Sequence, residues 1–353
     1  MSTDSVAVVG IGMMTSVGVS APETAASVRA ATARFVPTPM RDKQFQPFTI
    51  AEVPNDALPP LADPLHDVLS LSNRERRLLR LATSPLRECL RPLPPRPTKL
   101  AMCLALPEQE TTRPIDAAAF LSHLAIQTRA PFDATRSDAR HVGRAGGLLA
   151  IGQAVLTIQS GLSEFVIAGG IDSYRDLFIL GTLDREQRAK SETNLDGFIP
   201  GEGAAFLLLA NARTAVANRI PVIAHVAPIV TGFEPGHLYS AEPYRGDGLA
   251  QTFQQLVARG DVQAPIGEVY SSMTGESHWV KEWGVAFMRS RGAFREGHGM
   301  HHPADCFGET GAASGPLMVG LAALGINGRY RRSPALAYGS SDRGARAAMI
   351  VTA

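Results

Sequence analysis

The stretch HVGRAGGLLAIGQAVLTIQSGLSEFVIAGG, residues 141–170, predicts a glycine-rich turn, a helix and then a buried strand. Many enzymes hold a nucleophile at such a turn. Here the residue at its tip is Arg144, whose guanidinium stays protonated and has no lone pair with which to attack a carbonyl. The chain is therefore either an enzyme whose reactive groups lie elsewhere or an enzyme-like fold that has lost this chemistry.

A second group of reactive side chains lies in REGHGMHHPADC, residues 295–306. His298, His301, His302 and Cys306 are all of types that bind zinc, but their spacing matches no standard structural zinc site. We expect a solvated loop here and no metal.

Other signals for catalysis are weaker. Ser271 and Ser272 do not lie in a G-x-S-x-G context, which disfavours a serine hydrolase. The segment GIGMMTSVG lacks the full G-x-G-x-x-G pattern, so we expect no dinucleotide cofactor. Three cysteines, Cys89, Cys103 and Cys306, are too few and scattered for a disulfide framework, which indicates a reducing compartment. Cys103, in LAMCLAL, is expected in a core strand.

Hydrophobic spacing predicts the elements that position these residues. Leu148, Ile151, Val155 and Ile158 are spaced to share one face of a helix. Residues 35–65 are proline-rich and are expected to be irregular. Strands are expected within 5–18, 99–106, 164–170, 196–210 and 267–275, helices within 20–35, 72–90, 248–261 and 308–325, and a terminal hairpin within 333–353.

The pattern of helix, strand, glycine-rich turn, helix and strand pair occurs twice, which predicts an internal duplication about a pseudo-twofold axis. We place the two halves at residues 1–215 and 216–353 and expect the nucleophile-type turn in the first. Both are of the α/β class.

Composition places the chain among ordinary globular proteins. Of 353 residues, 45% are hydrophobic and 19% charged, with a formal net charge of +1. No block of charge points to nucleic acid or to an anionic membrane. No apolar run approaches the roughly 20 residues of a membrane span, and no basic segment precedes the first apolar run as in a signal peptide. We expect a cytoplasmic protein.

Five segments together resemble one family. VAVVGIGMMTSVG, VIAGGIDSY, DGFIPGEGAAFLLLA, FGETGAASG and AYGSSDRGARAAMIV are similar, in the same order, to landmarks of the β-ketoacyl-acyl carrier protein synthases, or ketosynthases. DGFIPGEGA is the most specific of the five. The resemblance implies the thiolase fold, with duplicated βαβαβαββ halves in a five-layer αβαβα arrangement, and assembly as a dimer. It also implies that Glu202 is a structural acceptor inside its hairpin and that Cys306 is buried as a small hydrophobe.

The resemblance also locates three positions of a catalytic triad. The family's cysteine position holds Arg144, its first histidine position holds Ser272, and its second holds Glu309. A buried, unpaired arginine costs several kcal/mol, of order 3–5, so a carboxylate is expected to neutralise it. We therefore predict an Arg144–Glu309 ion pair, with Ser272 hydrogen-bonded nearby, and no active catalytic residue.

These substitutions favour a non-catalytic, ketosynthase-like protein that acts as a binding, scaffold or adaptor subunit without a cofactor. Two alternatives stay open: a chain-length-factor-like partner of an active ketosynthase in fatty acid or polyketide synthesis, and an acyltransferase with an altered active site. The expected partner is a protein, either a ketosynthase-like subunit, a carrier protein or a secreted effector.

Overall fold

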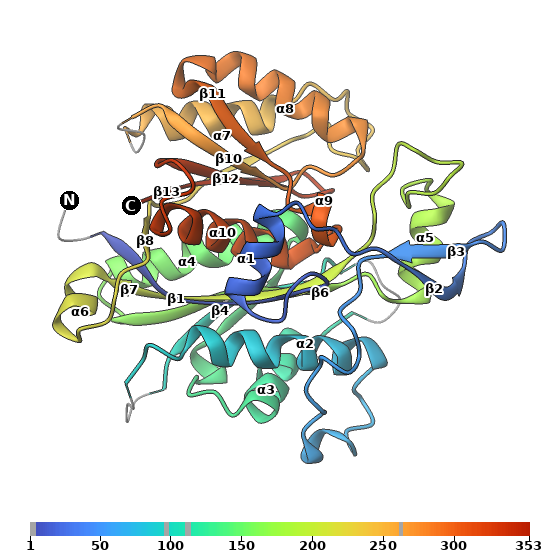
Figure 1. Cartoon of the computed structure of the whole chain (residues 1–353), viewed down its shortest axis with the longest axis horizontal. Helices are drawn as coiled ribbons and strands as arrows, with labels where there is room; N and C mark the ends of the chain where they lie inside the picture. Colours follow the sequence, from blue (N-terminus) through green and yellow to red (C-terminus); the bar gives the residue numbers. More distant parts are fainter. Residues whose placement is uncertain (1–4, 95–98, 110–113, 261–263) are drawn as a thin grey trace.

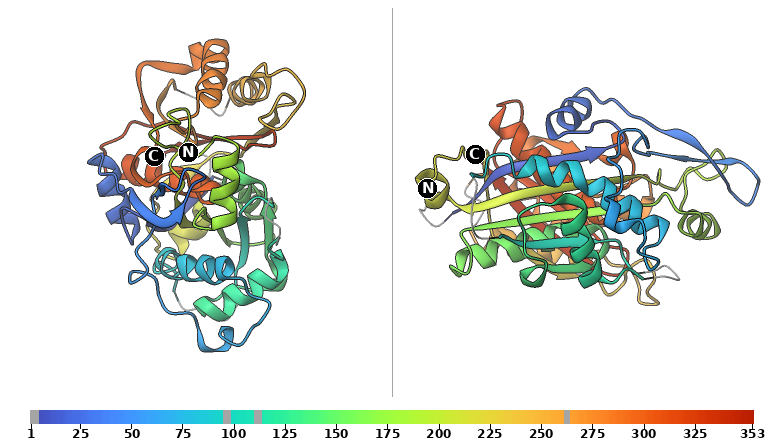
Figure 2. Two further views of the ribbon diagram at one scale, coloured as in Figure 1. Left: turned by 90° about the vertical axis from the view of Figure 1, so that its right-hand side faces the viewer. Right: turned by 90° about the horizontal axis from the view of Figure 1, so that it is seen from below.

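Two β-sheets of similar strand order enclose a pair of central helices in the computed structural model, which describes residues 5–94, 99–109, 114–260 and 264–353 (Figure 1). Outer helices cover the other face of each sheet, so the layers alternate α, β, α, β, α. Figure 2 shows the same stack from two further sides. This arrangement confirms the predicted α/β class and the five-layer fold.

Among the described residues, eleven strands form one hydrogen-bonded sheet that divides into two layers: a first sheet of order β5-β4-β6-β7-β1 and a second sheet of order β11-β10-β12-β13 (Figure 1). In the first sheet, β4 has a parallel neighbour on each side, and β6 then pairs antiparallel with β7. In the second sheet, β10 likewise has two parallel neighbours, and β12 pairs antiparallel with β13, so the second sheet repeats the first. β8 pairs with both β1 and β13 and thereby joins the two sheets, while β9 adds to β13. The strands are β1 (Val6–Thr15), β4 (Ala101–Leu106), β5 (Asp138–His141), β6 (Phe165–Ser173), β7 (Glu202–Asn211), β8 (Ala224–Val226), β9 (Val230–Phe233), β10 (Ile266–Ser271), β11 (Phe294–His301), β12 (Ala335–Ser340) and β13 (Ala345–Thr352).

The helices divide among the layers. α4 and α10 lie between the two sheets, with α1 beside them. α2 and α3 cover the outer face of the first sheet, and α7 and α8 cover the outer face of the second (Figure 1). Their bounds, with those of the shorter helices, are α1 (Ala21–Arg29), α2 (Asn73–Cys89), α3 (Ala117–Thr128), α4 (Gly146–Gln159), α5 (Leu177–Arg185), α6 (Ala212–Ala217), α7 (Asp247–Ala258), α8 (Ser277–Ser290), α9 (Ala304–Phe307) and α10 (Ser314–Asn327). The boundary expected between the halves, at residue 215, lies within α6.

Local sequence explains where several of these elements begin. Ser72 and Glu75 form a reciprocal capping box at the start of α2, and Ser20 caps α1. In α4, the predicted apolar face is confirmed, because Leu148, Ile151, Val155 and Ile158 are all buried. The expected terminal hairpin is also confirmed as β12 and β13.

The two central helices approach so closely that glycine is required between them. A Cβ atom added to Gly147 of α4 would lie 2.2 Å from Cδ of Pro316 and 2.7 Å from the carbonyl oxygen of Ala312. Real side chains do not tolerate such distances. Gly147 thus lets the N-terminal ends of α4 and α10 meet, and the turns before these ends carry Arg144 and Glu309.

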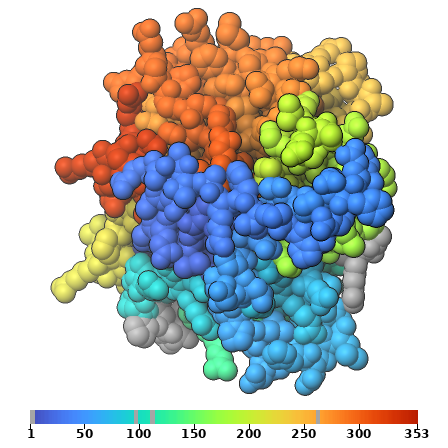
Figure 3. Space-filling view, turned by 45° about the vertical axis from the view of Figure 1, so that its right-hand side comes forward, coloured from blue at the N-terminus to red at the C-terminus, as the bar shows by residue number. Residues whose placement is uncertain are grey.

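Two expectations about loops were wrong. Residues 35–65 are not wholly irregular, because β2 (Val36–Arg41) and β3 (Pro47–Ile50) form an antiparallel hairpin. Phe48 and Ile50 of this hairpin pack against Leu180 and Leu183 of α5, and Figure 3 shows the blue N-terminal segment lying against the yellow-green one. Residues 295–306 are not a solvated loop either, since β11 and α9 account for most of them.

Among the described residues, no helix is both long enough and apolar enough to cross a bilayer.

Candidate functional site

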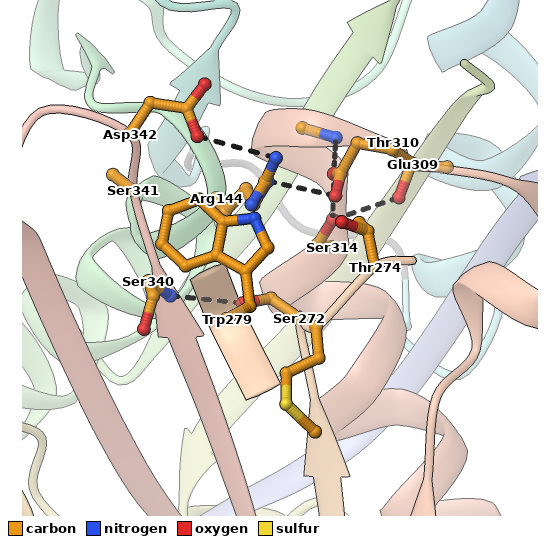
Figure 4. A network of polar contacts seen from close by, with 12 residues as sticks. Arg144, Ser272, Thr274, Trp279, Glu309, Thr310, Ser314, Ser340, Ser341 and Asp342 are labelled. Carbon is orange, nitrogen blue, oxygen red and sulfur yellow. Dashed lines mark hydrogen bonds and ion pairs between the residues drawn. The ribbon is translucent and has the colours of Figure 1, made fainter. Parts of the chain in front are cut away.

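Arg144 lies where β5 leads through a single 3-10 turn, Gly143–Ala145, into α4. Gly143 has φ of +69°, a conformation that glycine adopts without strain and that turns the chain sharply. The side chain of Arg144 is only 2% exposed. Figure 4 shows it extending toward Glu309 and Asp342, which come from the second half of the chain.

The predicted ion pair between Arg144 and Glu309 is confirmed. Nε of Arg144 lies 2.9 Å from Oε2 of Glu309 (Figure 4). Two more carboxylates face the same guanidinium, because Nη2 lies 3.4 Å from Oδ1 of Asp342 and 3.5 Å from Oε2 of Glu276. The N–H groups of Arg144 are not aligned for hydrogen bonds to these oxygens. The attraction is therefore between charges rather than through directed bonds.

Glu309 is held in place through its other oxygen. Oε1 accepts hydrogen bonds from the backbone N–H of Gly311, at 2.6 Å, and from the hydroxyl of Ser314, at 3.2 Å. Both donors belong to the turn that opens α10. One oxygen of Glu309 is thus fixed by its own turn, and the other is directed at Arg144.

A second arginine completes the cluster. Nε of Arg188 donates to Oε1 of Glu276 at 2.7 Å, and its Nη1 donates to Oδ2 of Asp342 at 2.6 Å. Each of these two carboxylates therefore contacts both guanidiniums. Arg144 and Arg188 face three carboxylates, so the cluster carries a formal charge of −1 when every group is ionised.

Aromatic rings enclose the guanidinium of Arg144. Its Cζ lies 4.6 Å from the centre of the Trp279 ring and 5.7 Å from that of Phe198. The indole N–H of Trp279 donates to Oε2 of Glu276 at 2.8 Å, which orients both groups. A desolvated cation over an aromatic face is stabilised by the negative face of the ring.

The cluster perturbs the acidity of its members. Burial alone would lower the pKa of Arg144, but attraction to Glu309, Asp342 and Glu276 raises it above its ordinary value. Burial alone would raise the pKa of Asp342, and Arg144 and Arg188 reverse the effect so that this pKa is lowered. The pKa of Glu276 is lowered for the same reason, chiefly through Arg188. For Glu309 burial dominates and raises the pKa, although Arg144 offsets part of it.

Ser272 lies close by but has another partner. The backbone N–H of Ser340 donates to its hydroxyl oxygen at 3.0 Å. Ser272 is thus hydrogen-bonded near the ion pair, as expected, although among the described contacts it bonds to neither Arg144 nor Glu309. Ser272 and Glu309 do line one very small cavity of about 10 Å³, and they lie on opposing elements of it.

Little open space remains around Arg144. The adjoining cavity has a volume of about 80 Å³, and its lining includes Arg144, Arg188, Phe178 and Tyr239. This is smaller than the roughly 150 Å³ of an engineered cavity that binds one benzene molecule. The volume next to the guanidinium is thus suited to a few water molecules or a short side chain.

The remaining residues singled out from sequence have structural surroundings. Glu202 is fully buried, and one of its oxygens accepts from Nε of Arg77 at 2.7 Å and from the hydroxyl of Ser173 at 2.7 Å, as expected of a structural acceptor. Cys103 is buried in β4 and Cys306 in α9, and burial raises the pKa of both thiols.

The histidine-rich segment is dispersed. His301 is paired with Glu268 at 2.6 Å, and the backbone carbonyl of Arg295 lies 3.1 Å from Nδ1 of His298. Within the described ranges, no group of three or more histidine, cysteine or acidic side chains is placed to hold a metal ion.

Sequence reasoning missed Arg188, Glu276, Asp342 and Trp279. Asp342 follows the glycine- and serine-rich turn YGSS, and Glu276 follows SSMTG, so each is a lone charge in a small-residue segment that ends a buried strand. Such charges are unusual next to a core, and this is the signal that identifies them.

Comparisons with known proteins agree with this architecture. Residues 143–215 match the family model of the β-ketoacyl synthase N-terminal domain. Among curated proteins, no sequence matches the chain.

Solved structures match over nearly the whole chain. The ishigamide ketosynthase/chain length factor aligns with 17% identity, 99% of both chains and a TM-score of 0.79. A type II polyketide ketosynthase in complex with its acyl-carrier protein aligns at 15% identity, 99% of both chains and a TM-score of 0.79. The ketosynthase from module 6 of the Bacillus subtilis 168 bacillaene synthase aligns at 13% identity, covering 99% of this chain and 72% of that one, with a TM-score of 0.80. The chain thus has the fold of the ketosynthases, and residues 143–215 also match the β-ketoacyl synthase N-terminal domain in sequence.

Proposed function

We propose that this protein is a non-catalytic, ketosynthase-like subunit that acts by binding another protein. The observation that carries the proposal is the burial of Arg144, held by Glu309, Glu276 and Asp342, at the turn where a ketosynthase is expected to present its cysteine. A guanidinium that is protonated at all physiological pH values cannot accept an acyl group.

The two other triad positions support the same proposal. A ketosynthase uses two histidines to polarise the thioester oxygen and to assist decarboxylation. Ser272 has no acid or base function near neutral pH, and its hydroxyl oxygen is engaged by Ser340. Glu309 would place a carboxylate where negative charge must develop on the substrate oxygen. Each substitution opposes the reaction on its own.

A binding role also explains why the site is filled rather than left open. The charged cluster joins the turn before α4, the turn before α10 and the segments after β10 and β12, so it connects both halves of the chain. It holds in place the surface that surrounds it, including α5, whose Leu177 and Phe178 are exposed. Phe178 lines the cavity beside Arg144, Leu177 precedes it in the chain, and both exposed apolar side chains are suited to contact a protein partner.

A turnover assay tests the proposal. The purified protein is mixed with acyl- and malonyl-carrier protein, with an active ketosynthase as the positive control. We expect no condensed product from this protein alone. Condensation at a rate comparable to the control would contradict the proposal and favour the acyltransferase with an altered active site.

A chain-length-factor-like role is a second candidate, favoured by the alignment of 99% of both chains with the ishigamide ketosynthase/chain length factor. In this case the partner is an active ketosynthase. The role predicts a stable complex of one ketosynthase with one copy of this chain and a change in product length upon mixing. A complex that leaves the products unchanged would favour a scaffold or adaptor.

A further inference from the structure

A second cavity, of about 180 Å³, lies away from the Arg144 cluster and shares none of its lining residues with the cavity beside Arg144. Its walls come from α1, the middle of α10 and the segment that follows it, β10, and the end of β11 with α9. The proposed function assigns no role to this cavity.

Two guanidiniums stand at its edge. Cζ of Arg29 lies 4.9 Å and Cζ of Arg331 lies 5.8 Å from the ring centre of Tyr330. The charge of Arg331 also acts on Tyr270, where it offsets part of the rise in pKa that burial causes. Neither arginine has an ion-pair partner in the part of the chain that the structure describes. Two cations thus converge on one aromatic ring without a carboxylate between them.

A buried polar atom also faces this region without a partner. Nδ1 of His302 is inaccessible to solvent and has no hydrogen-bond partner among the described residues. The neighbouring His301 differs, because its Nε2 is held by Glu268 at 2.6 Å and its ring lies against Tyr270 at 4.7 Å. Buried polar groups are normally satisfied, so the unpaired nitrogen of His302 indicates a missing partner.

The other walls are apolar or already engaged. Val28, Met300 and Leu321 supply hydrocarbon surface. Of the two nearby carboxylates, Glu268 is occupied by His301 and by the backbone N–H of Arg332, and Asp305 lines the cavity but is exposed, so that solvent screens its charge. The cavity is slightly larger than the roughly 150 Å³ of an engineered cavity that binds benzene, so one ring-sized apolar group fits.

We propose that this cavity binds a compact aromatic carboxylate, with its ring between the tyrosines and the apolar wall and its carboxylate at Arg29 and Arg331. Guanidinium groups recognise carboxylates through charge-assisted, often bidentate hydrogen bonds. The ring supplies apolar contact that an inorganic anion lacks. The imidazole of His302 supplies a further polar contact to the carboxylate.

Calorimetric titration with benzoate tests this assignment, with benzamide and inorganic phosphate as matched probes. We expect benzoate to bind. Benzamide lacks the charge of the carboxylate and phosphate lacks the aromatic ring, so each should bind at least about tenfold more weakly than benzoate. Equal binding of all three probes would contradict the proposal. So would the absence of benzoate binding up to roughly 10 mM.

Variants locate the binding to this cavity. Arg29→Met and Arg331→Met keep most of the apolar stem but remove the charge, and each should weaken benzoate binding by about tenfold. Arg332→Met is the control, because Arg332 donates to the carbonyl of Gly297 and does not line the cavity. Circular dichroism of each variant verifies folding. Unchanged affinity in both cavity variants would overturn the site even if benzoate binds.

Discussion

The buried position of the Arg144 guanidinium is electrostatically unfavourable unless neighbouring groups neutralise its charge. A cation at the N-terminal end of a helix is unfavourable by roughly 0.3–1 kcal/mol, and leaving it buried and unpaired adds several kcal/mol more. Three carboxylates and two aromatic rings surround the guanidinium instead. The stability of the site therefore depends on every member being present.

We predict that Arg144→Met destabilises the protein by about 3–5 kcal/mol, because Glu309 loses its cation while staying buried. Removing both charges, in Arg144→Met with Glu309→Leu, should cost less than the sum of the two single changes. Urea unfolding of the four proteins measures this coupling. Strict additivity would show that the pair contributes no coupling energy.

The acidity of Asp342 leads to a prediction about pH. Its pKa is lowered below 3.8 in the folded protein, so its contribution to stability is complete above that value and is lost as the pH falls through the folded pKa. Asp342→Asn should therefore be less stable than the parent by about 1.5–3 kcal/mol at pH 7. The difference between the two proteins should shrink below about pH 4. A difference that is constant down to pH 2 would contradict this assignment.

The sequence predicts some of the individual residues of the site. Arg144 is found because it lies in a glycine-rich turn before a helix, and Glu309 because its turn resembles a ketosynthase landmark. Arg188, Glu276 and Asp342 are not found, since their approach depends on segments up to 154 residues apart in the chain. Local sequence patterns do not predict which distant loops contact one another in the fold. The hydrogen bond between Ser272 and Ser340 was not predicted, for the same reason.

Among the elements, the contact between α4 and α10 governs the geometry of the site. Gly147 lies where a Cβ atom would meet Pro316 and the backbone of Ala312. Any displacement of these helices would separate Arg144 from Glu309. The close contact is therefore a requirement of the ion pair as well as of the core.

We predict that Gly147→Ala destabilises the fold by about 1–3 kcal/mol through overpacking, although alanine is the better helix former by roughly 0.5–1 kcal/mol. Gly181→Ala is the matched control, because Gly181 lies in α5 with nothing within 4 Å of an added Cβ atom. It should be neutral or slightly stabilising. Thermal unfolding compares the two variants, and equal shifts would contradict the proposed contact.

Elements with strong periodicity were predictable, and those that depend on distant contacts were not. α2 follows from its capping residues and apolar spacing, and α4 and α10 follow from a glycine-rich turn and the apolar run after it. The β2–β3 hairpin contains prolines in VPTPMR, which disfavour a strand in isolation, and it is stabilised by packing of Phe48 and Ile50 on α5. Tertiary contact there outweighs local preference.

For the whole molecule, the repeat of two similar sheets explains why charged groups from both halves meet at one point. The turns before α4 and α10 occupy corresponding places, and the cluster of Arg144 and Glu309 lies between them (Figures 1 and 4). The duplication was predicted from recurring segments. The exact boundary at residue 215 stays a prediction.

We predict that the protein forms a two-chain assembly, either with a second copy of itself or with its partner. β5 is an edge strand, and Leu177, Phe178 and Leu195 are large apolar side chains exposed to solvent. Edge strands and apolar patches are normally covered in stable proteins. Light scattering at micromolar concentration should give about twice the chain mass of 37.5 kDa for the protein alone, or a complex of two chains with its partner. A monomer under both conditions would contradict assembly.

A non-catalytic role requires that no residue of this protein accepts an acyl group. Intact-mass spectrometry after incubation with an acyl thioester, on carrier protein or coenzyme A, tests it most directly, with an active ketosynthase as the positive control. We predict an unmodified mass for this protein under conditions that acylate the control. A stable mass increase of one acyl group, located on any residue, would contradict the account.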